Sequence, residues 1–132
     1  NRDKDGKKIP RAKSIEAVKK LQCFKLEEEK LIIEGKKGLT QIYRNFLLSE
    51  TYGFDEGLQS YSIILAPKNH PSTKREFNSL HNELREEYQH KIKPIDLEKF
   101  VNNIIRVCPE TYKSAFERFY DRYLNFAKLE RY

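Results

Sequence analysis

Residues 39–51, LTQIYRNFLLSET, decide the fold class more clearly than any other stretch of the chain. Apolar side chains recur there at the i, i+3, i+4, i+7 and i+8 positions that form one face of an α-helix. They are Leu39, Ile42, Tyr43, Phe46 and Leu47. An adjoining, mostly polar face holds the i, i+3, i+4 and i+7 positions Gln41, Arg44, Asn45 and Leu48. This spacing predicts a helix with one buried face and a polar face beside it.

A strand is predicted at residues 59–66, QSYSIILA, after a turn at residues 52–57. Both of its faces are largely apolar, a pattern typical of a strand buried on both sides. A second, short strand is predicted at residues 91–96, KIKPID. Two strands alone do not make a stable sheet. We therefore expect either residues 30–33, KLII, to pair with them, or strands outside this segment to complete the sheet. The helix at residues 39–51 should pack across the strand at 59–66.

Helical patterns occur in four further segments. Residues 14–24 place Ile15, Val18, Leu21 and Phe24 on one face, with Ser14 suited to the N-cap. Residues 73–88 begin with a capping-box signature, Thr73 followed by Glu76, and carry Phe77, Leu80, Leu84 and Tyr88. Asp96 is expected to cap a helix carrying Leu97, Phe100, Val101, Ile104 and Ile105, and Pro109 to open a long last helix. We expect an α/β fold that is predominantly helical with a few central strands.

The last predicted helix carries a continuous aromatic stripe. Its members are Tyr112, Ala115, Phe116, Phe119, Tyr120, Tyr123 and Ala127. Regular spacing of this kind predicts core or subunit interface, and a homo-oligomer through this helix is one expectation. A base-stacking platform would instead need these rings in solvent.

Length and composition indicate one ordinary domain. The chain has 132 residues, 38% hydrophobic, with eight Phe and eight Tyr, which is enough to close a single core. It begins with Asn1 and contains no Met, so we interpret it as a fragment. No apolar run approaches the length of a membrane helix and no signal peptide is evident, so we expect a soluble, cytoplasmic protein. Cys23 and Cys108 lie far apart among apolar residues, which predicts two buried thiols and no zinc site.

Positive charge is concentrated at the N-terminus. Of the net charge of +6, residues 1–20 contribute eight Lys or Arg against three acids, and the remainder is nearly neutral. Residues 1–13 are predicted to be a basic flexible arm, either a solvated loop or a contact to nucleic-acid phosphates. The candidate phosphate contacts are Lys7, Lys8, Arg11 and Lys13, together with Lys37.

The segment GLTQIYRNFLLSETYG, followed by YSIILAP and KNH, resembles a branch of the PD-(D/E)XK nuclease superfamily, which has the restriction-endonuclease-like fold. In those relatives a helix with a Gln-x-x-Arg-Asn pattern follows the metal-binding strands and precedes another core strand. Here the pattern is Gln41, Arg44 and Asn45, and the likeness covers about residues 20–107. It implies that residues 1–132 are one nuclease-like domain or its C-terminal part.

The resemblance also implies a reaction, Mg²⁺-dependent hydrolysis of DNA phosphodiesters. By this resemblance Gln41, Arg44 and Asn45 support the catalytic site. A local Glu-x-Lys, Glu34 to Lys36, matches the catalytic motif in composition, with Glu34 as a metal ligand; the alternative is that the ligands lie in sequence outside this segment. We predict that Gln41 and Arg44 share a pocket with at least two carboxylates, either Glu34 and a partner or acids supplied from elsewhere.

A rival hypothesis comes from a different functional class. The chain could be a non-catalytic helical α/β interaction module, whose basic N-terminal arm and aromatic last helix bind protein or nucleic acid. The sequence has no Gly-rich phosphate loop and no nucleophile-elbow motif, so kinase and serine-hydrolase functions lack support.

Overall fold

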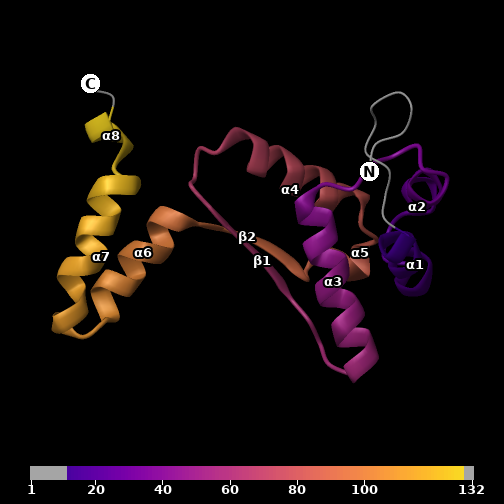
Figure 1. Ribbon diagram of the computed structural model, residues 1–132, viewed down its shortest axis with the longest axis horizontal. Coiled ribbons are helices and arrows are strands. Elements are labelled where there is room, and N and C mark those ends of the chain that lie inside the picture. Colours follow the sequence, from indigo (N-terminus) through magenta and orange to yellow (C-terminus); the bar gives the residue numbers. More distant parts are fainter. Residues whose placement is uncertain (1–11, 130–132) are drawn as a thin grey trace. The chain divides into compact units, whose positions relative to one another are not determined.

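The computed structural model describes residues 12–129 (Figure 1). About 68% of the described residues are helical, with a small parallel two-stranded sheet, which confirms the predominantly helical α/β class. The described elements, in chain order, are α1 (Ala12–Leu21), α2 (Leu26–Ile33), α3 (Gln41–Glu56), β1 (Ser62–Ala66), α4 (Pro71–Glu83), α5 (Glu86–Gln89), β2 (Ile92–Asp96), α6 (Leu97–Val107), α7 (Glu110–Tyr123) and α8 (Phe126–Leu129).

The chain divides into two compact units. The first comprises the described residues up to Ile64 together with Ser72–Lys93, and the second comprises Leu65–Pro71 and the described residues from Pro94 onward. Each strand of the sheet begins in the first unit and ends in the second.

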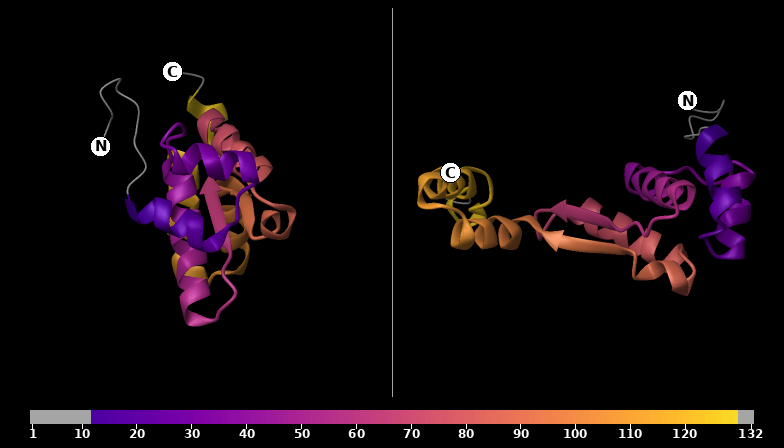
Figure 2. Two further views of the ribbon diagram at one scale, coloured as in Figure 1. Left: turned by 90° about the vertical axis from the view of Figure 1, so that its right-hand side faces the viewer. Right: turned by 90° about the horizontal axis from the view of Figure 1, so that it is seen from below.

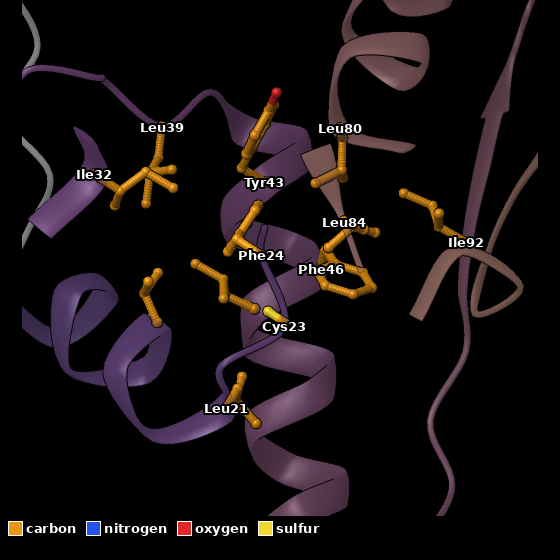
Figure 3. Packing of buried hydrophobic residues seen from close by; sticks show 12 residues of the cluster. Leu21, Cys23, Phe24, Ile32, Leu39, Tyr43, Phe46, Leu80, Leu84 and Ile92 are labelled. Atoms are coloured by element: carbon orange, nitrogen blue, oxygen red, sulfur yellow. The ribbon is translucent and has the colours of Figure 1, made fainter. Parts of the chain in front are cut away.

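The core of the first unit is built on the apolar face of α3 (Figure 3). Tyr43, Phe46 and Leu47 are buried, as the spacing predicted, and Ile42 is half-buried. Leu39 is also buried, but it precedes the N-cap Thr40, so the helix begins at Gln41 and not at the predicted residue 39. Around them pack apolar residues of the neighbouring elements, namely Val18, Leu21, Cys23, Phe24, Ile32, Leu80, Leu84 and Ile92. Ile64 of β1 packs against the same cluster, so α3 and one face of the sheet share a core.

The first helix differs from its prediction at both ends. It begins at Ala12, so Ser14 lies inside the helix and the predicted N-cap is wrong. It ends at Leu21 because Gln22 adopts a left-handed conformation with φ 50°. Phe24 therefore lies outside the helix, yet it is fully buried and forms an isolated antiparallel bridge with Leu84.

The ambiguous KLII segment is helical. Residues 26–33 form α2, which ends where Gly35 takes φ +70° and its N–H bonds to Ile32 O at 3.1 Å. The N–H of Lys36 bonds to Leu31 O at 2.9 Å and completes the C-terminal cap. This segment therefore does not pair with the strands.

The predicted turn at residues 52–57 is wrong, because α3 continues through Glu56. The helix ends only at Gly57, whose φ is +64°. Gly53 permits the chain to fold back over the helix, since a Cβ there would lie 2.8 Å from Leu58 O and 2.9 Å from Ser60 Oγ. The glycine is required by this close approach of the backbone and not by its own dihedral angles.

The strand β1 is shorter than predicted and is not buried on both faces. Ile63 is 64% exposed and Leu65 44% exposed, whereas Ser62, Ile64 and Ala66 are half-buried. The short strand β2 is confirmed, and Figure 2 shows the two strand arrows pointing the same way. The N–H of Ser62 bonds to Lys91 O at 2.7 Å. Among residues 12–129 no other strand joins this sheet. The face of β1 that carries Ile63 and Leu65 is open.

The single helix predicted at residues 73–88 is two helices. The first, α4, begins at Pro71, so the predicted cap at Thr73 is wrong, and it ends at Glu83. The helix ends there because Leu84 forms a β-bridge with Phe24. Tyr88 then lies in the short helix α5.

The second unit contains α6 and α7, which pack side by side (Figure 1). Asp96 is the N-cap position of α6, as predicted, although its side chain makes no capping hydrogen bond. Pro109 is the N-cap of α7 and not its first residue. The prediction that the aromatic stripe is core is wrong, because α7 has no buried residue and Tyr112 and Tyr123 are 59% and 53% exposed. Its role as a subunit interface stays a prediction.

Candidate functional site

The polar face of α3 lines a groove against α1, within the first unit. The groove has a volume of about 450 Å³. Its described lining comprises Lys13, Ser14 and Ala17 of α1 and Gln41, Arg44, Asn45, Leu47, Leu48 and Thr51 of α3. The buried stripe of α3 packs against α1 through the core, so it turns the Gln-x-x-Arg-Asn face toward this groove. The structure therefore brings together the three residues that the sequence singled out on this helix.

Side-chain hydrogen bonds tie these three residues to one another. The amide nitrogen Nε2 of Gln41 donates to Asn45 Oδ1 at 2.7 Å, and a terminal nitrogen of Arg44 donates to Gln41 Oε1 at 3.1 Å. Gln41 thus holds its two neighbours through both ends of its amide, at the i, i+3 and i, i+4 spacing of a helix. The guanidinium of Arg44 keeps further N–H groups for another acceptor.

The groove is cationic. Its described lining includes Lys13 and Arg44 and no Asp or Glu. No carboxylate among residues 12–129 lies within ion-pair distance of the half-buried Arg44. The prediction that Glu34 supplies a carboxylate to this pocket is therefore wrong, whereas the alternative, acids supplied from elsewhere, stays a prediction. A half-buried guanidinium without an acidic partner favours binding of an anion.

Glu34 and Lys36 lie on the turn that follows α2. The Nζ atom of Lys36 is 2.6 Å from Glu34 Oε2, and the Lys36 side chain is 65% exposed. The hydrogen bond from Lys36 holds the pKa of Glu34 below its usual value. Both residues follow a helix and not a strand, and neither lines the groove. The structure places this Glu-x-Lys on the surface, in an ion pair.

Of the predicted phosphate contacts that the structure describes, Lys13 lines the groove and Lys37 does not. Lys7, Lys8 and Arg11 lie outside the described residues. Lys37 is held between Glu28 Oε2, at 2.7 Å, and Glu83. Although desolvation acts in the opposite direction, hydrogen bonds to these two acids raise the pKa of Lys37. The ammonium of Lys37 is thus engaged by carboxylates of the chain itself.

The described residues do not fit a metal ion. Within residues 12–129 no group of three or more His, Cys, Asp or Glu side chains is arranged to hold one. The groove offers amide and cationic groups, whereas Mg²⁺ is held by oxygen ligands that include carboxylates. This donor set is suited to a phosphate and not to a cation.

Sequence reasoning missed a buried carboxylate, Glu50. It is 4% exposed, forms an ion pair with Lys91 and accepts a hydrogen bond from Ser60 Oγ at 2.7 Å. A signal was available, because Glu50 lies at i+4 from Phe46 and i+7 from Tyr43, on the apolar stripe of α3. The pair joins α3 to the beginning of β2 and to the loop before β1. These contacts tie the buried side of α3 to those two segments.

Comparisons with known proteins identify a family. The family model described as "Restriction Endonuclease associating with ARP" matches residues 2–124, which is nearly the whole chain. No curated protein and no solved structure matches the chain significantly. Within residues 12–129 no helix is both long and apolar enough to cross a membrane. The chain belongs to the family described as restriction endonuclease associating with ARP.

Proposed function

We propose that this chain binds DNA phosphate in the groove between α1 and α3, as part of a restriction-endonuclease-like protein that cleaves DNA. The single observation that carries the proposal is the half-buried Arg44, which is oriented by Gln41 and has no carboxylate partner among the described residues. A guanidinium in this setting can donate two N–H groups to one phosphate. The family match supports DNA as the source of that phosphate.

Each residue of the groove has a distinct role in the proposal. Arg44 contacts a phosphate oxygen, Lys13 adds a second positive charge, and Gln41 fixes the guanidinium through the bond to its Oε1. Asn45, held by Gln41, restrains the other end of the amide. In a cleavage reaction, Arg44 stabilises the negative charge that develops on the phosphate in the transition state.

Membership of the PD-(D/E)XK superfamily and a requirement for Mg²⁺ are part of the proposal. The resemblance of the α3 segment implies both, whereas the family match supports only the coarser statement, a restriction-endonuclease-like protein. The donor set of the groove does not fit a metal ion, so we assign no metal ligand to the described residues. By this proposal the catalytic carboxylates come from outside the groove.

A cleavage assay tests the proposal. Supercoiled plasmid is incubated with the intact protein that contains this chain, in Mg²⁺ or in chelator, and nicked and linear products are measured. We expect Arg44→Ala and Gln41→Ala to lower Mg²⁺-dependent cleavage by about tenfold or more, with the melting temperature nearly unchanged. Arg75→Ala is the matched control, since Arg75 is an exposed arginine of the same unit that does not line the groove.

Two results would count against the proposal. If the Arg44 and Gln41 variants unfold early while the folded remainder cuts at the normal rate, these residues are scaffold. If the intact protein that contains this chain binds duplex DNA but cleaves none with any divalent metal, the rival hypothesis of a non-catalytic binding module is supported.

A further inference from the structure

The hairpin of α6 and α7 carries two apolar stripes on each helix, only one of which is used in packing. Helix α6 packs against α7, and the buried or half-buried apolar residues include Val101 and Ile105 of α6, Phe116 and Tyr120 of α7, and Leu124, which directly follows α7. The second stripe of α6 is Phe100, Ile104 and Val107, and that of α7 is Tyr112, Phe119 and Tyr123. Phe100 is 42%, Val107 73%, Tyr112 59%, Phe119 40% and Tyr123 53% exposed, whereas Ile104, at the border of the two stripes, is half-buried. These six residues are called the open face below.

Helix geometry places both second stripes on the same side of the hairpin. At 3.6 residues per turn, each open stripe lies about a quarter turn from its packed stripe, in the same rotational sense along the chain. Helices α6 and α7 run antiparallel (Figure 1). Because the open stripe is rotated from the packed stripe in the same direction on both helices, this geometry brings both open stripes to one side of the hairpin. The hairpin therefore presents one continuous apolar face with four aromatic rings.

Positive charge frames the open face. The same helix geometry places Lys99 and Arg106 on the outer edge of α6, and Arg118 and Arg122 on the outer edge of α7. All four are exposed, and none has an ion-pair partner among residues 12–129. Arg122 also lies 5.3 Å from the centroid of the Tyr123 ring. An anionic ligand would therefore meet cations on both edges of the rings.

Acidic residues of the hairpin lie on the opposite side. They are Glu98, Glu110, Glu117 and Asp121. Three of these carboxylates are already engaged: Glu98 accepts from the Lys68 N–H at 2.9 Å, Glu110 pairs with Lys113 at 3.1 Å, and Asp121 pairs with Lys128 at 2.5 Å. The open face thus combines exposed rings with unopposed positive charge.

The distribution of aromatic rings and charged residues on the hairpin favours one class of ligand for the open face. If two copies of the chain packed open face to open face, the cations of one copy would lie against the cations of the other, which is unfavourable. A single strand of nucleic acid supplies both complements, because its bases stack on exposed aromatic rings and its phosphates pair with Lys and Arg. We infer that the open face of α6 and α7 binds single-stranded DNA, with bases on Tyr112, Phe119 and Tyr123 and phosphates along the two cationic edges.

The inference rests on the proposed function only for the choice of DNA as ligand, since it concerns a separate surface in the second unit. The test is fluorescence anisotropy of a labelled oligothymidine of about 20 nucleotides, long enough to span one binding site, titrated with the full chain. We expect Tyr123→Ala and Phe119→Ala each to raise the Kd by about tenfold, and Tyr123→Phe to retain binding. Arg118→Gln with Arg122→Gln should reduce the salt slope of binding by about 1.4.

Tyr61→Ala is the matched control, because Tyr61 is a tyrosine of similar exposure outside the second unit, and its loss should leave oligothymidine binding unchanged. Equal binding by wild type and the ring variants would overturn the inference. The inference would also be overturned if the ring variants left oligonucleotide affinity unchanged but abolished a dimer seen by sedimentation. The same holds if they abolished binding to vesicles of anionic lipid and left oligonucleotide affinity unchanged. Loss of duplex cleavage in Arg44→Ala, with oligothymidine binding intact, separates the groove from this surface.

Discussion

Removing Lys91 should destabilise the first unit strongly, because it leaves Glu50 buried without its counter-ion. Glu50 is 4% exposed and the Lys91 side chain 18% exposed. In Lys91→Met the aliphatic part of the side chain is retained, and only the charge and its hydrogen bonds are lost. The remaining partner of the carboxylate is the hydroxyl of Ser60, at 2.7 Å.

The expected magnitude follows from this burial. Breaking a buried ion pair by removing one partner costs about 3–5 kcal/mol, and we expect about 3 kcal/mol because Lys91 keeps some access to water. In a unit of this size such a loss lowers the melting temperature by about 10 °C or more. Glu50→Gln combined with Lys91→Met should be less destabilised than Lys91→Met alone, since no unpaired charge then stays buried.

Urea unfolding followed by circular dichroism measures these differences. Lys36→Met is the matched control, because it breaks the exposed pair with Glu34 and should leave stability nearly unchanged. If Lys91→Met is no less stable than this control, the ion pair contributes nothing to the fold and our reasoning about the scaffold of α3 is refuted.

Three further predictions concern the same core. Burial raises the pKa of the fully buried Cys23 to about 12. Iodoacetamide at pH 8 should therefore alkylate Cys108 and leave Cys23 unmodified, as measured by mass spectrometry of peptides, and equal labelling would contradict this. Burial, and then the hydrogen bond to Glu83, raises the pKa of Tyr43 in the folded state. The stability that the neutral phenol contributes is therefore fully present below the unfolded pKa of about 10 and is lost as the pH rises further. Stability measured by unfolding should fall more steeply at alkaline pH in wild type than in Tyr43→Phe, and parallel curves would refute this. Gly53→Ala should destabilise by about 1–2 kcal/mol in thermal unfolding, because the added Cβ would lie 2.8 Å from a backbone oxygen, and a more stable variant would show that no close approach exists.

The buried face of α3 could be predicted because its signal is local. Leu39, Tyr43, Phe46 and Leu47 repeat at helical spacing, and all are buried. The end of α3 could not be predicted, since Gly53 usually marks a turn and only the return of residues 58–60 explains it inside the helix. The break at Leu84 depends on a bridge to Phe24, sixty residues earlier in the chain. Long-range contacts of this kind leave no periodic pattern in the sequence.

The candidate site was predictable in part because its signal is also local. Gln41, Arg44 and Asn45 lie within five residues, so helical spacing alone places them on one face, and their hydrogen bonds confirm it. Glu34 was misplaced because the three-residue motif carries no information on whether it follows a strand or a helix. The aromatic stripe of α7 was expected in the core because its spacing is regular, but spacing does not say whether an element exists to cover it.

The salt dependence of duplex DNA binding tests the central claim most directly. In wild type, each phosphate contact in the groove adds about 0.9 to the slope of log K against log salt concentration. If Lys13 and Arg44 each hold a phosphate, Lys13→Gln with Arg44→Gln should lower that slope by about 1.8 and weaken binding at every salt concentration. An unchanged slope in a folded double variant would contradict the assignment of the groove between α1 and α3 as a phosphate-binding site.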